Sequence, residues 1–305
     1  KISLFCNIGR ASVIESIDAP TIYEVPFNML REGLDIQVLK KLGISAKGEP
    51  DLEKWKSFLY RLKNPLTEVN IGLVGKYVEL KDAYKSISEA FIHAGAATQC
   101  KVKIKWIHSE KLEDNPDCIQ EELQGLNGIL VAPGFGSRGI EGKIMAVRYA
   151  RENKIPFLGI CLGMQCAVIE FARNVLGYKD AHSVEMSAST THPVIDIMEE
   201  QKLIQNMGGT MRLGAYPCKL KENTKIYSAY QKENISERHR HRYEFNNAYL
   251  EAFEQAGMIA SGINPDTNLV EVVEIPSHPY FVGVQYHPEY RSTVVEPSPL
   301  FISFV

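Results

Sequence analysis

The fold and the candidate site both follow from one stretch of the chain, Gly159-Ile160-Cys161-Leu162-Gly163-Met164-Gln165. The apolar run from Ile155 to Ile160 predicts a short buried strand, and a helical pattern follows from Met164 to about Leu176. A cysteine between two glycines at a strand-to-helix turn is the pattern of a nucleophile elbow. The helix start offers free N–H groups, which favour the reactive thiolate. A small buried cysteine in a tight turn would show the same pattern, so this stretch alone leaves both interpretations open.

Outward from this stretch, short apolar runs and helical patterns alternate along the chain. Strands are expected at 70–75, 102–108, 128–132 and 157–160, and helices at 82–95, 142–153 and 164–176. This alternation predicts an α/β fold with a doubly wound, mostly parallel sheet and flanking helices. In such sheets the site lies at the carboxyl ends of the strands. Cys161 falls there, and so does the loop Ala132-Pro133-Gly134-Phe135-Gly136.

After about Ala181 the alternation fades, and the pattern predicts a small, partly antiparallel extension of the fold. Short strands are expected at 210–213, 218–220, 243–245, 269–275 and 280–285. A helix is expected from Asn247 to Gly257, because the glycine is a common helix stop.

The first part of the chain, residues 1–44, looks like the end of something larger. Runs at 1–6 and 13–17 are compatible with short strands, and a helix is expected from Pro26 to Leu42, ended by Gly43. These elements are too few to enclose a core of their own. Residues 45–68 have the glycine and prolines of a linker, and a short packed helix is expected within them near 55–62. We therefore expect a tail at 1–44, a linker at 45–68 and a domain at 69–305.

Composition narrows the class of protein. The chain has 305 residues, of which 45% are hydrophobic and 23% charged, and its net charge of −3 gives no support for nucleic-acid binding. There is no run of 18 or more apolar residues that would predict a membrane span. The start shows neither a secretory signal nor an initiator methionine. We therefore expect a cytoplasmic protein, or a fragment of one, with no nucleic-acid or membrane partner.

The six cysteines are expected to be reduced thiols. They form no Cys-x-x-Cys pair and no cysteine–histidine spacing typical of a metal site, so no metal is expected. Cys166 lies about one turn after Cys161 on the same expected helix, and core packing is the favoured interpretation for it.

A cysteine nucleophile needs a base and a group that orients the base, and the best candidates lie in Gln285-Tyr286-His287-Pro288-Glu289. Residues i and i+2 of an extended segment point to the same side, and Pro288 disfavours a helix at His287. His287 and Glu289 can therefore project together, which would complete a Cys-His-Glu triad. A His-Pro-Glu tripeptide alone is a weak signal, but an upstream elbow in an α/β domain makes it a strong one.

The elbow together with His287-Pro288-Glu289 resembles the class I (triad) glutamine amidotransferase family. More specifically, the chain is similar to the CTP synthase family, with a match from about residue 69 to the C-terminus. Residues 1–44 resemble the end of that family's synthase (amidoligase) domain. The stretches that carry the resemblance are Leu73-Val74-Gly75-Lys76-Tyr77, Asp82-Ala83-Tyr84-Lys85-Ser86, Gly134-Phe135-Gly136, Arg138-Gly139, Glu141-Gly142-Lys143, 208–214 and 237–244.

The resemblance implies a glutaminase mechanism for the triad. Cys161 would attack the side-chain amide of L-glutamine, and the N–H groups of Leu162 and Gly134 would form the oxyanion hole. His287 would give a proton to the departing ammonia and then activate water to hydrolyse the γ-glutamyl thioester. Glu289 would orient His287.

The resemblance also implies a set of glutamine-binding residues: Gly134, Leu162, Gly163, Met164, Gln165, Glu185 and Arg242. Glu185 would hold the ammonium group of glutamine, and Arg242 would lie near its α-carboxylate. Two stretches depart from the family pattern: Pro133 stands where a glycine is usual, and Val184 and Met186 replace the usual neighbours of Glu185. Neither departure removes a catalytic group.

Further implications of the resemblance concern partners that lie outside this chain or act on it. Ammonia would pass to the synthase domain, where ATP and Mg²⁺ support the conversion of UTP to CTP in a homotetramer; no cofactor is expected in this chain. GTP would be an allosteric activator, with Phe135, Arg138 and Arg212 placed near it. The 208–214 stretch would belong to a mobile lid, although an ordinary turn before a strand would look the same.

Two other functions remain open alongside glutamine hydrolysis. A cysteine peptidase or other hydrolase could use the same elbow, but Glu185 and Arg242 suit the two charged ends of a free amino acid. A catalytically silent regulatory module is disfavoured by the intact triad. The alternating arginines and histidines at 238–242 would, without the resemblance, be interpreted as a solvated charged edge.

Overall fold

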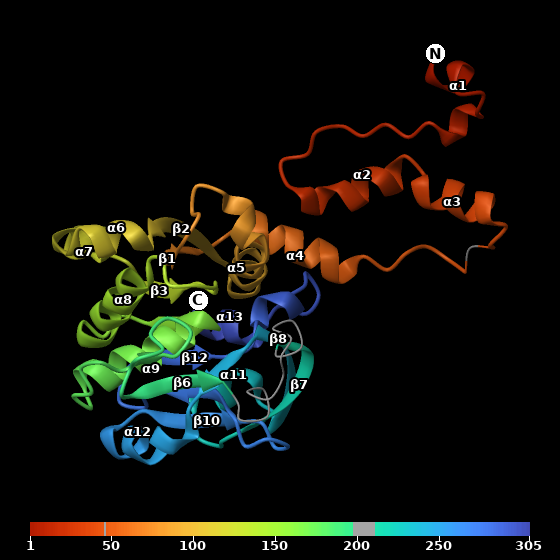
Figure 1. The fold of residues 1–305 in the computed structure, drawn as a ribbon. Helices are drawn as coiled ribbons and strands as arrows, with labels where there is room; N and C mark the ends of the chain where they lie inside the picture. Colours follow the sequence, from red (N-terminus) through yellow and green to blue (C-terminus); the bar gives the residue numbers. More distant parts are fainter. Residues whose placement is uncertain (46, 198–210) are drawn as a thin grey trace. The chain divides into compact units, whose positions relative to one another are not determined.

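The computed structural model describes residues 1–45, 47–197 and 211–305 of the chain (Figure 1). These residues fall into two compact units, Lys1–Lys63 and Asn64–Val305. The boundary between the units lies within 45–68, the stretch expected to be a linker. The division into a tail, a linker and a domain stays a prediction.

The first unit is helical. Its helices are α1 (Ile2–Phe5), α2 (Val25–Arg31), α3 (Leu34–Leu42) and α4 (Glu53–Lys63). Tyr23, which precedes α2, packs against α4. Its ring contacts Phe58 edge-on, and its carbonyl oxygen accepts a hydrogen bond from Trp55 Nε1 at 2.8 Å.

Two expectations for the first unit were wrong. Residues 2–5 form a helix and 13–17 form no strand, because periodicity does not separate helix from strand in such short apolar runs. The single helix expected from Pro26 to Leu42 is divided into α2 and α3. Gly33 adopts a left-handed conformation at φ 71° and ends the first of them, whereas Gly43 caps α3 as expected.

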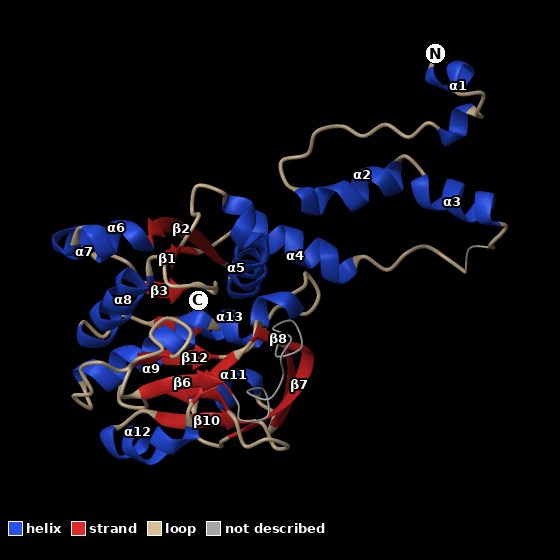
Figure 2. Cartoon of the chain, viewed as in Figure 1, coloured by secondary structure: helices blue, strands red, loops and turns tan. Residues whose placement is uncertain are grey.

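The second unit is organised around a nine-stranded sheet of order β2-β1-β3-β4-β12-β11-β10-β7-β8 (Figure 2). The first five strands in this order are parallel: β2 (Cys100–His108), β1 (Thr67–Gly75), β3 (Gly128–Val131), β4 (Phe157–Ile160) and β12 (Phe281–Val284). The remaining four pair antiparallel: β11 (Val270–Glu274), β10 (Ile259–Ile263), β7 (Arg212–Leu220) and β8 (Asn234–His241). The predicted α/β fold with a mostly parallel sheet is confirmed.

The antiparallel extension differs from the prediction in its continuity. One strand, β7, covers 212–220, where two short strands were expected, because β8 pairs along it past Gly214 and Pro217. Thr210, the expected start of this region, lies outside the described residues. A second sheet contains β5 (His182–Ser183), β6 (Pro193–Ile197) and β9 (Tyr243–Phe245).

Helices cover both faces of the nine-stranded sheet, because alternate strand residues point to opposite sides. Leu158 and Ile160 of β4 join one apolar cluster with α5, while Phe157 joins the other with α8 and α9. Among the described residues of this unit, the helices are α5 (Lys85–Thr98), α6 (Ser109–Asp114), α7 (Ile119–Leu123), α8 (Ile140–Glu152), α9 (Leu162–Asn174), α11 (Lys225–Tyr230), α12 (Leu250–Ala256) and α13 (Pro299–Phe304).

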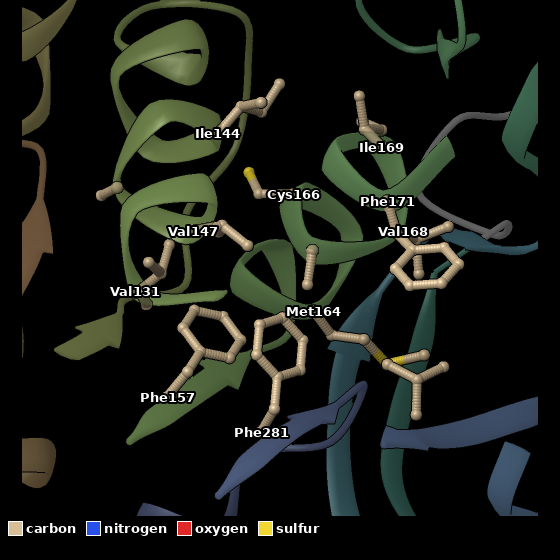
Figure 3. Close-up of a cluster of buried hydrophobic side chains, with 14 of the residues drawn as sticks. Val131, Ile144, Val147, Phe157, Met164, Cys166, Val168, Ile169, Phe171 and Phe281 are labelled. Carbon is tan, nitrogen blue, oxygen red and sulfur yellow. The ribbon is translucent and has the colours of Figure 1, made fainter. Parts of the chain in front are cut away.

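Cys166 and Met164 of α9 are fully buried in the core (Figure 3). The rings of Phe157 and Phe281 stack across β4 and β12 with centroids 4.4 Å apart. Cys166 is therefore a core residue as expected, and burial raises the pKa of its thiol to about 11. Over residues 1–45, 47–197 and 211–305, no helix combines the length and hydropathy needed to cross a bilayer.

Candidate active site

Cys161 occupies a strained turn between β4 and α9. Its backbone has φ 53° and ψ −105°, an unusual conformation for a residue with a side chain. Glycine is required at Gly159 and Gly163 because other backbone atoms lie where a side chain would begin. A Cβ on Gly163 would lie 2.1 Å from the carbonyl oxygen of Val131, and a Cβ on Gly159 would lie 2.7 Å from Gly163. The strain of this elbow is therefore concentrated on Cys161 itself.

The parallel pairing of β4 with β12 brings the histidine segment beside the elbow. Ile160 faces Val284 in the register, and the N–H of Cys161 donates to the carbonyl oxygen of Val284 at 2.7 Å. The chain after β12 therefore continues alongside Cys161. Gln285 Nε2 lies 3.7 Å from the Cys161 sulfur as a donor, and His287, two residues later, also interacts with Cys161.

His287 is held between Glu289 and Cys161. Its Nδ1 donates to Glu289 Oε1 at 2.7 Å, and both side chains are buried. Nε2 is buried and makes no hydrogen bond of standard geometry with a described residue, so it is available to the thiol. Burial lowers the pKa of His287, but interactions with Cys161 and Glu289 outweigh burial and raise this pKa to about 11. The arrangement favours an imidazolium beside the sulfur.

A cavity of about 150 Å³ has Cys161 in its lining. Its walls contain seven of the residues predicted for the site and three others: Gly134, Phe135, Cys161, Leu162, Gln165, Glu185, Met211, His241, Arg242 and Tyr243. Leu162 and Gln165 line it together because residues three apart share a helix face. Glu185 also fixes the nearby loop, since its Oε1 accepts from the N–H of Gly136 at 3.3 Å.

The other predicted residues lie elsewhere. Gly163 packs against Val131, and Met164 belongs to the core rather than to the cavity wall. Arg138 pairs with Glu110 and lies over the ring of Tyr77. Arg212 is buried and pairs with Glu244 at 3.0 Å and Glu271 at 2.9 Å. Gly208 and Gly209, which begin the stretch expected to form a lid, lie outside the described residues.

Several residues of the site have no role predicted from the sequence. Gln285 could have been found, because it precedes His287 by two positions in an extended segment and so shares its side. His241, Tyr243 and Met211 carried no comparable signal, since their place depends on how β7, β8 and β9 pack. Gln165 is anchored by Tyr243, whose carbonyl oxygen accepts from Gln165 Nε2 at 3.0 Å.

Residues 238–241 of the alternating run form the end of β8 and have two different faces, and Arg242 follows the strand. His239 and His241 are buried and their rings share a 2.8 Å hydrogen bond, whereas Arg238 and Arg240 are exposed. Burial lowers the pKa of His239 to about 3, so this histidine is neutral in the folded protein. The run is therefore a charged edge on one face only, and its other face is part of the protein interior.

An α/β sheet with a cysteine on a strained elbow, and a histidine–glutamate pair beside it, is an arrangement typical of cysteine-nucleophile enzymes built on this type of sheet. A family model described as Glutamine amidotransferase class-I matches residues 79–305. The chain therefore belongs to the class I glutamine amidotransferase family.

Individual relatives agree with this assignment. The chain is 65% identical over 305 residues to a CTP synthase of Cytophaga hutchinsonii and 55% identical to one of Carboxydothermus hydrogenoformans. All of this chain is covered in both matches, but only 56% of each relative, so the chain spans a little more than half of their length. Among solved structures, it resembles the glutaminase domain of Trypanosoma brucei CTPS with bound acivicin. That match has a TM-score of 0.73 and 41% identity, and covers 77% of this chain and 92% of the other.

Proposed function

We propose that this chain hydrolyses the side-chain amide of L-glutamine to glutamate and ammonia, with Cys161 as the nucleophile. The observation that carries the proposal is the shared cavity: Cys161, Glu185 and Arg242 line the same space of about 150 Å³. A reactive sulfur and two opposite charges around so small a space suit a free amino acid with an electrophilic side chain.

In the first half of the reaction, the Cys161 thiolate attacks the amide carbon of glutamine. The N–H groups of Leu162 and Gly134, which border the cavity, would stabilise the oxygen of the tetrahedral intermediate. The protonated His287 ring then gives its proton to the leaving nitrogen. The C–N bond breaks, ammonia departs, and a γ-glutamyl thioester remains on the sulfur.

In the second half, water replaces ammonia in the cavity. His287, now neutral, takes a proton from the water as the oxygen attacks the thioester carbon. The C–S bond breaks, glutamate is released, and the thiolate–imidazolium pair is restored. Glu289 keeps the Nδ1–H of His287 bound in both halves of the reaction, which leaves Nε2 to give and take the proton.

The charged ends of glutamine fix its orientation in this proposal. The Glu185 carboxylate would bind the α-ammonium group, and the Arg242 guanidinium would bind the α-carboxylate. Glu185 and Arg242 argue against a peptidase, because a residue inside a peptide chain has neither a free α-ammonium group nor a free α-carboxylate group for them to bind.

The relatives named CTP synthase support a wider proposal about the whole protein. The ammonia would pass to a synthase domain, which would use ATP and Mg²⁺ to convert UTP to CTP in a homotetramer. GTP would act as an allosteric activator near the exposed Phe135 and Arg138. Arg212 could join such a site only by leaving its two buried ion pairs.

The test uses a glutamine analogue in which a chloroketone replaces the side-chain amide. Incubation with this chain followed by mass spectrometry of its peptides should place one adduct on Cys161, and excess L-glutamine should protect against it. Absence of the adduct, or an adduct that glutamine does not prevent, would overturn the proposal. Glutaminase assays on wild type and Cys161→Ala distinguish glutamine hydrolysis from a catalytically silent module. Equal background activity in the two proteins would favour the silent module.

A further inference from the structure

Two buried lysines hold the loop that carries Gly134. Lys76 follows β1 and is only 6% exposed, and its Nζ donates to the carbonyl oxygens of Phe135 at 2.8 Å and Gly136 at 3.0 Å. Lys143 lies on α8 and is fully buried, and its Nζ donates to the carbonyl oxygen of Ala132 at 2.6 Å. The two ammonium groups therefore bind the loop on either side of Gly134.

We propose that Lys76 and Lys143 are positioning residues that aim the Gly134 N–H into the oxyanion hole. This inference rests on the proposed glutaminase function. A peptide plane fixes the direction of its N–H relative to its carbonyl group. The N–H of Gly134 belongs to the peptide plane between Pro133 and Gly134. This plane lies between the carbonyl groups of Ala132 and Phe135, which the two ammonium groups hold, so its rotation is restricted from both sides. Pro133 restricts the loop further because its ring fixes φ.

The burial of Lys143 indicates that fold stability alone does not explain why a lysine stands at this position. A fully buried ammonium group carries a large desolvation cost, and an apolar side chain of similar volume would avoid it. Burial lowers the pKa of Lys143 to about 8, which reflects that cost. A Cβ built on Gly134 would be 3.7 Å from Lys143 Nζ, so the charge lies directly beneath the loop.

The position of Lys76 is itself fixed. The hydroxyl group of Tyr84 donates to the carbonyl oxygen of Lys76 at 2.5 Å, and Tyr84 is buried. β1 also pairs with β3, the strand that leads into the loop. Lys76 therefore links the carboxyl ends of β1 and β3, two neighbouring parallel strands, at the end of the sheet where the cavity lies.

The test compares Lys76→Met and Lys143→Met with Lys105→Met. Methionine keeps the volume and removes the donors. Lys105 is the matched control because its Nζ also donates to a backbone carbonyl oxygen, that of Glu122 at 2.7 Å, on the exposed surface. We expect kcat for glutamine to fall about 10²-fold or more in the first two variants, the loss typical of one oxyanion-hole donor. KM and the rate of Cys161 alkylation by iodoacetamide should stay within about threefold of wild type.

The alkylation rate separates positioning from general damage, because iodoacetamide needs the thiolate but no oxyanion hole. Equal losses of kcat and alkylation, or kcat unchanged in Lys76→Met, would overturn the inference. Lys76→Arg keeps a donor for the loop carbonyl groups and should recover part of kcat. It also provides the test if Lys143→Met does not fold.

Amide hydrogen exchange at 134–136 tests the loop independently of turnover. Exchange should become at least about tenfold faster in Lys76→Met and stay unchanged in Lys105→Met. If wild type were inactive while exchange was still faster in Lys76→Met, the proposed function would be overturned, but Lys76 would still be shown to hold the loop. Unchanged exchange would overturn the inference whether or not wild type is active.

Discussion

His287 and Glu289 form a 2.7 Å hydrogen bond across a single proline, with Nδ1 donating to Oε1. Pro288 starts the short turn at 288–291, and the His287 ring also stacks on Tyr290 with centroids 4.9 Å apart. The ring is therefore fixed in one orientation by two neighbours from its own segment. This local fixation explains how one short segment supplies both the base and the group that orients it.

Glu289→Gln should lower kcat about 10²-fold and move the alkaline limb of the pH–rate profile to lower pH. The carboxylate raises the pKa of His287, so its removal lets the imidazolium lose its proton about one or more pH units earlier. The folded pKa lies above the unfolded value of about 6.5. Any stability from the protonated ring is thus complete below pH 6.5 and is lost as pH rises toward 11.

A matched control for this variant is Glu296→Gln, on an exposed side chain of the same segment. Its pH–rate profile and urea midpoint should match wild type. An alkaline limb that does not move in Glu289→Gln would show that Glu289 does not set the His287 pKa.

Cys161→Gly should be more stable than Cys161→Ala by about 1 kcal/mol. Alanine keeps the Cβ at φ 53°, whereas glycine tolerates a positive φ and releases the strain. Urea denaturation of both inactive variants measures the difference. At Cys166, in the regular part of α9, the order should reverse, with glycine about 1 kcal/mol less stable than alanine. The same order at both positions would contradict a strained elbow.

Much of the fold could be predicted because its signals are local. The parallel strands are short apolar runs, and β4 at Phe157–Ile160 has the bounds expected from the sequence. The long antiparallel strand β7 could not be predicted, because Gly214 and Pro217 look like breaks. Its continuity comes from β8, a partner that local patterns do not reveal.

The site shows the same limit at the level of single residues. The cysteine, histidine and glutamate stand in recognisable local motifs, but their meeting depends on β4 and β12 being neighbours in the sheet. Proximity in sequence misleads at Met164. It follows Cys161 closely, yet the helix turns its side chain into the core, and Gln165 returns to the cavity.

Arg212→Met should destabilise the fold by about 3–5 kcal/mol, because it leaves two buried carboxylates without their cation. The guanidinium donates to Glu244 and Glu271, and all three side chains are at least nine-tenths buried. Urea denaturation measures the loss. Arg240→Met, on the exposed face of the adjacent strand, should change stability by less than about 1 kcal/mol. A small effect at Arg212 would instead favour a role in binding an effector.

Glu185→Gln should separate recognition of the α-ammonium group from the chemistry. The amide keeps an acceptor for the N–H of Gly136, so the loop contact survives while the negative charge is lost. A charged hydrogen bond contributes about 1.5–3 kcal/mol, so KM for glutamine should rise about 10–100-fold with kcat changed far less. Glutaramic acid, which is glutamine without its amino group, should be hydrolysed equally by variant and wild type. Glu254→Gln, on the exposed side of α12, should leave both substrates unaffected. If the variant lost activity equally on glutamine and glutaramic acid, Glu185 would be acting on the loop and not on the ammonium group.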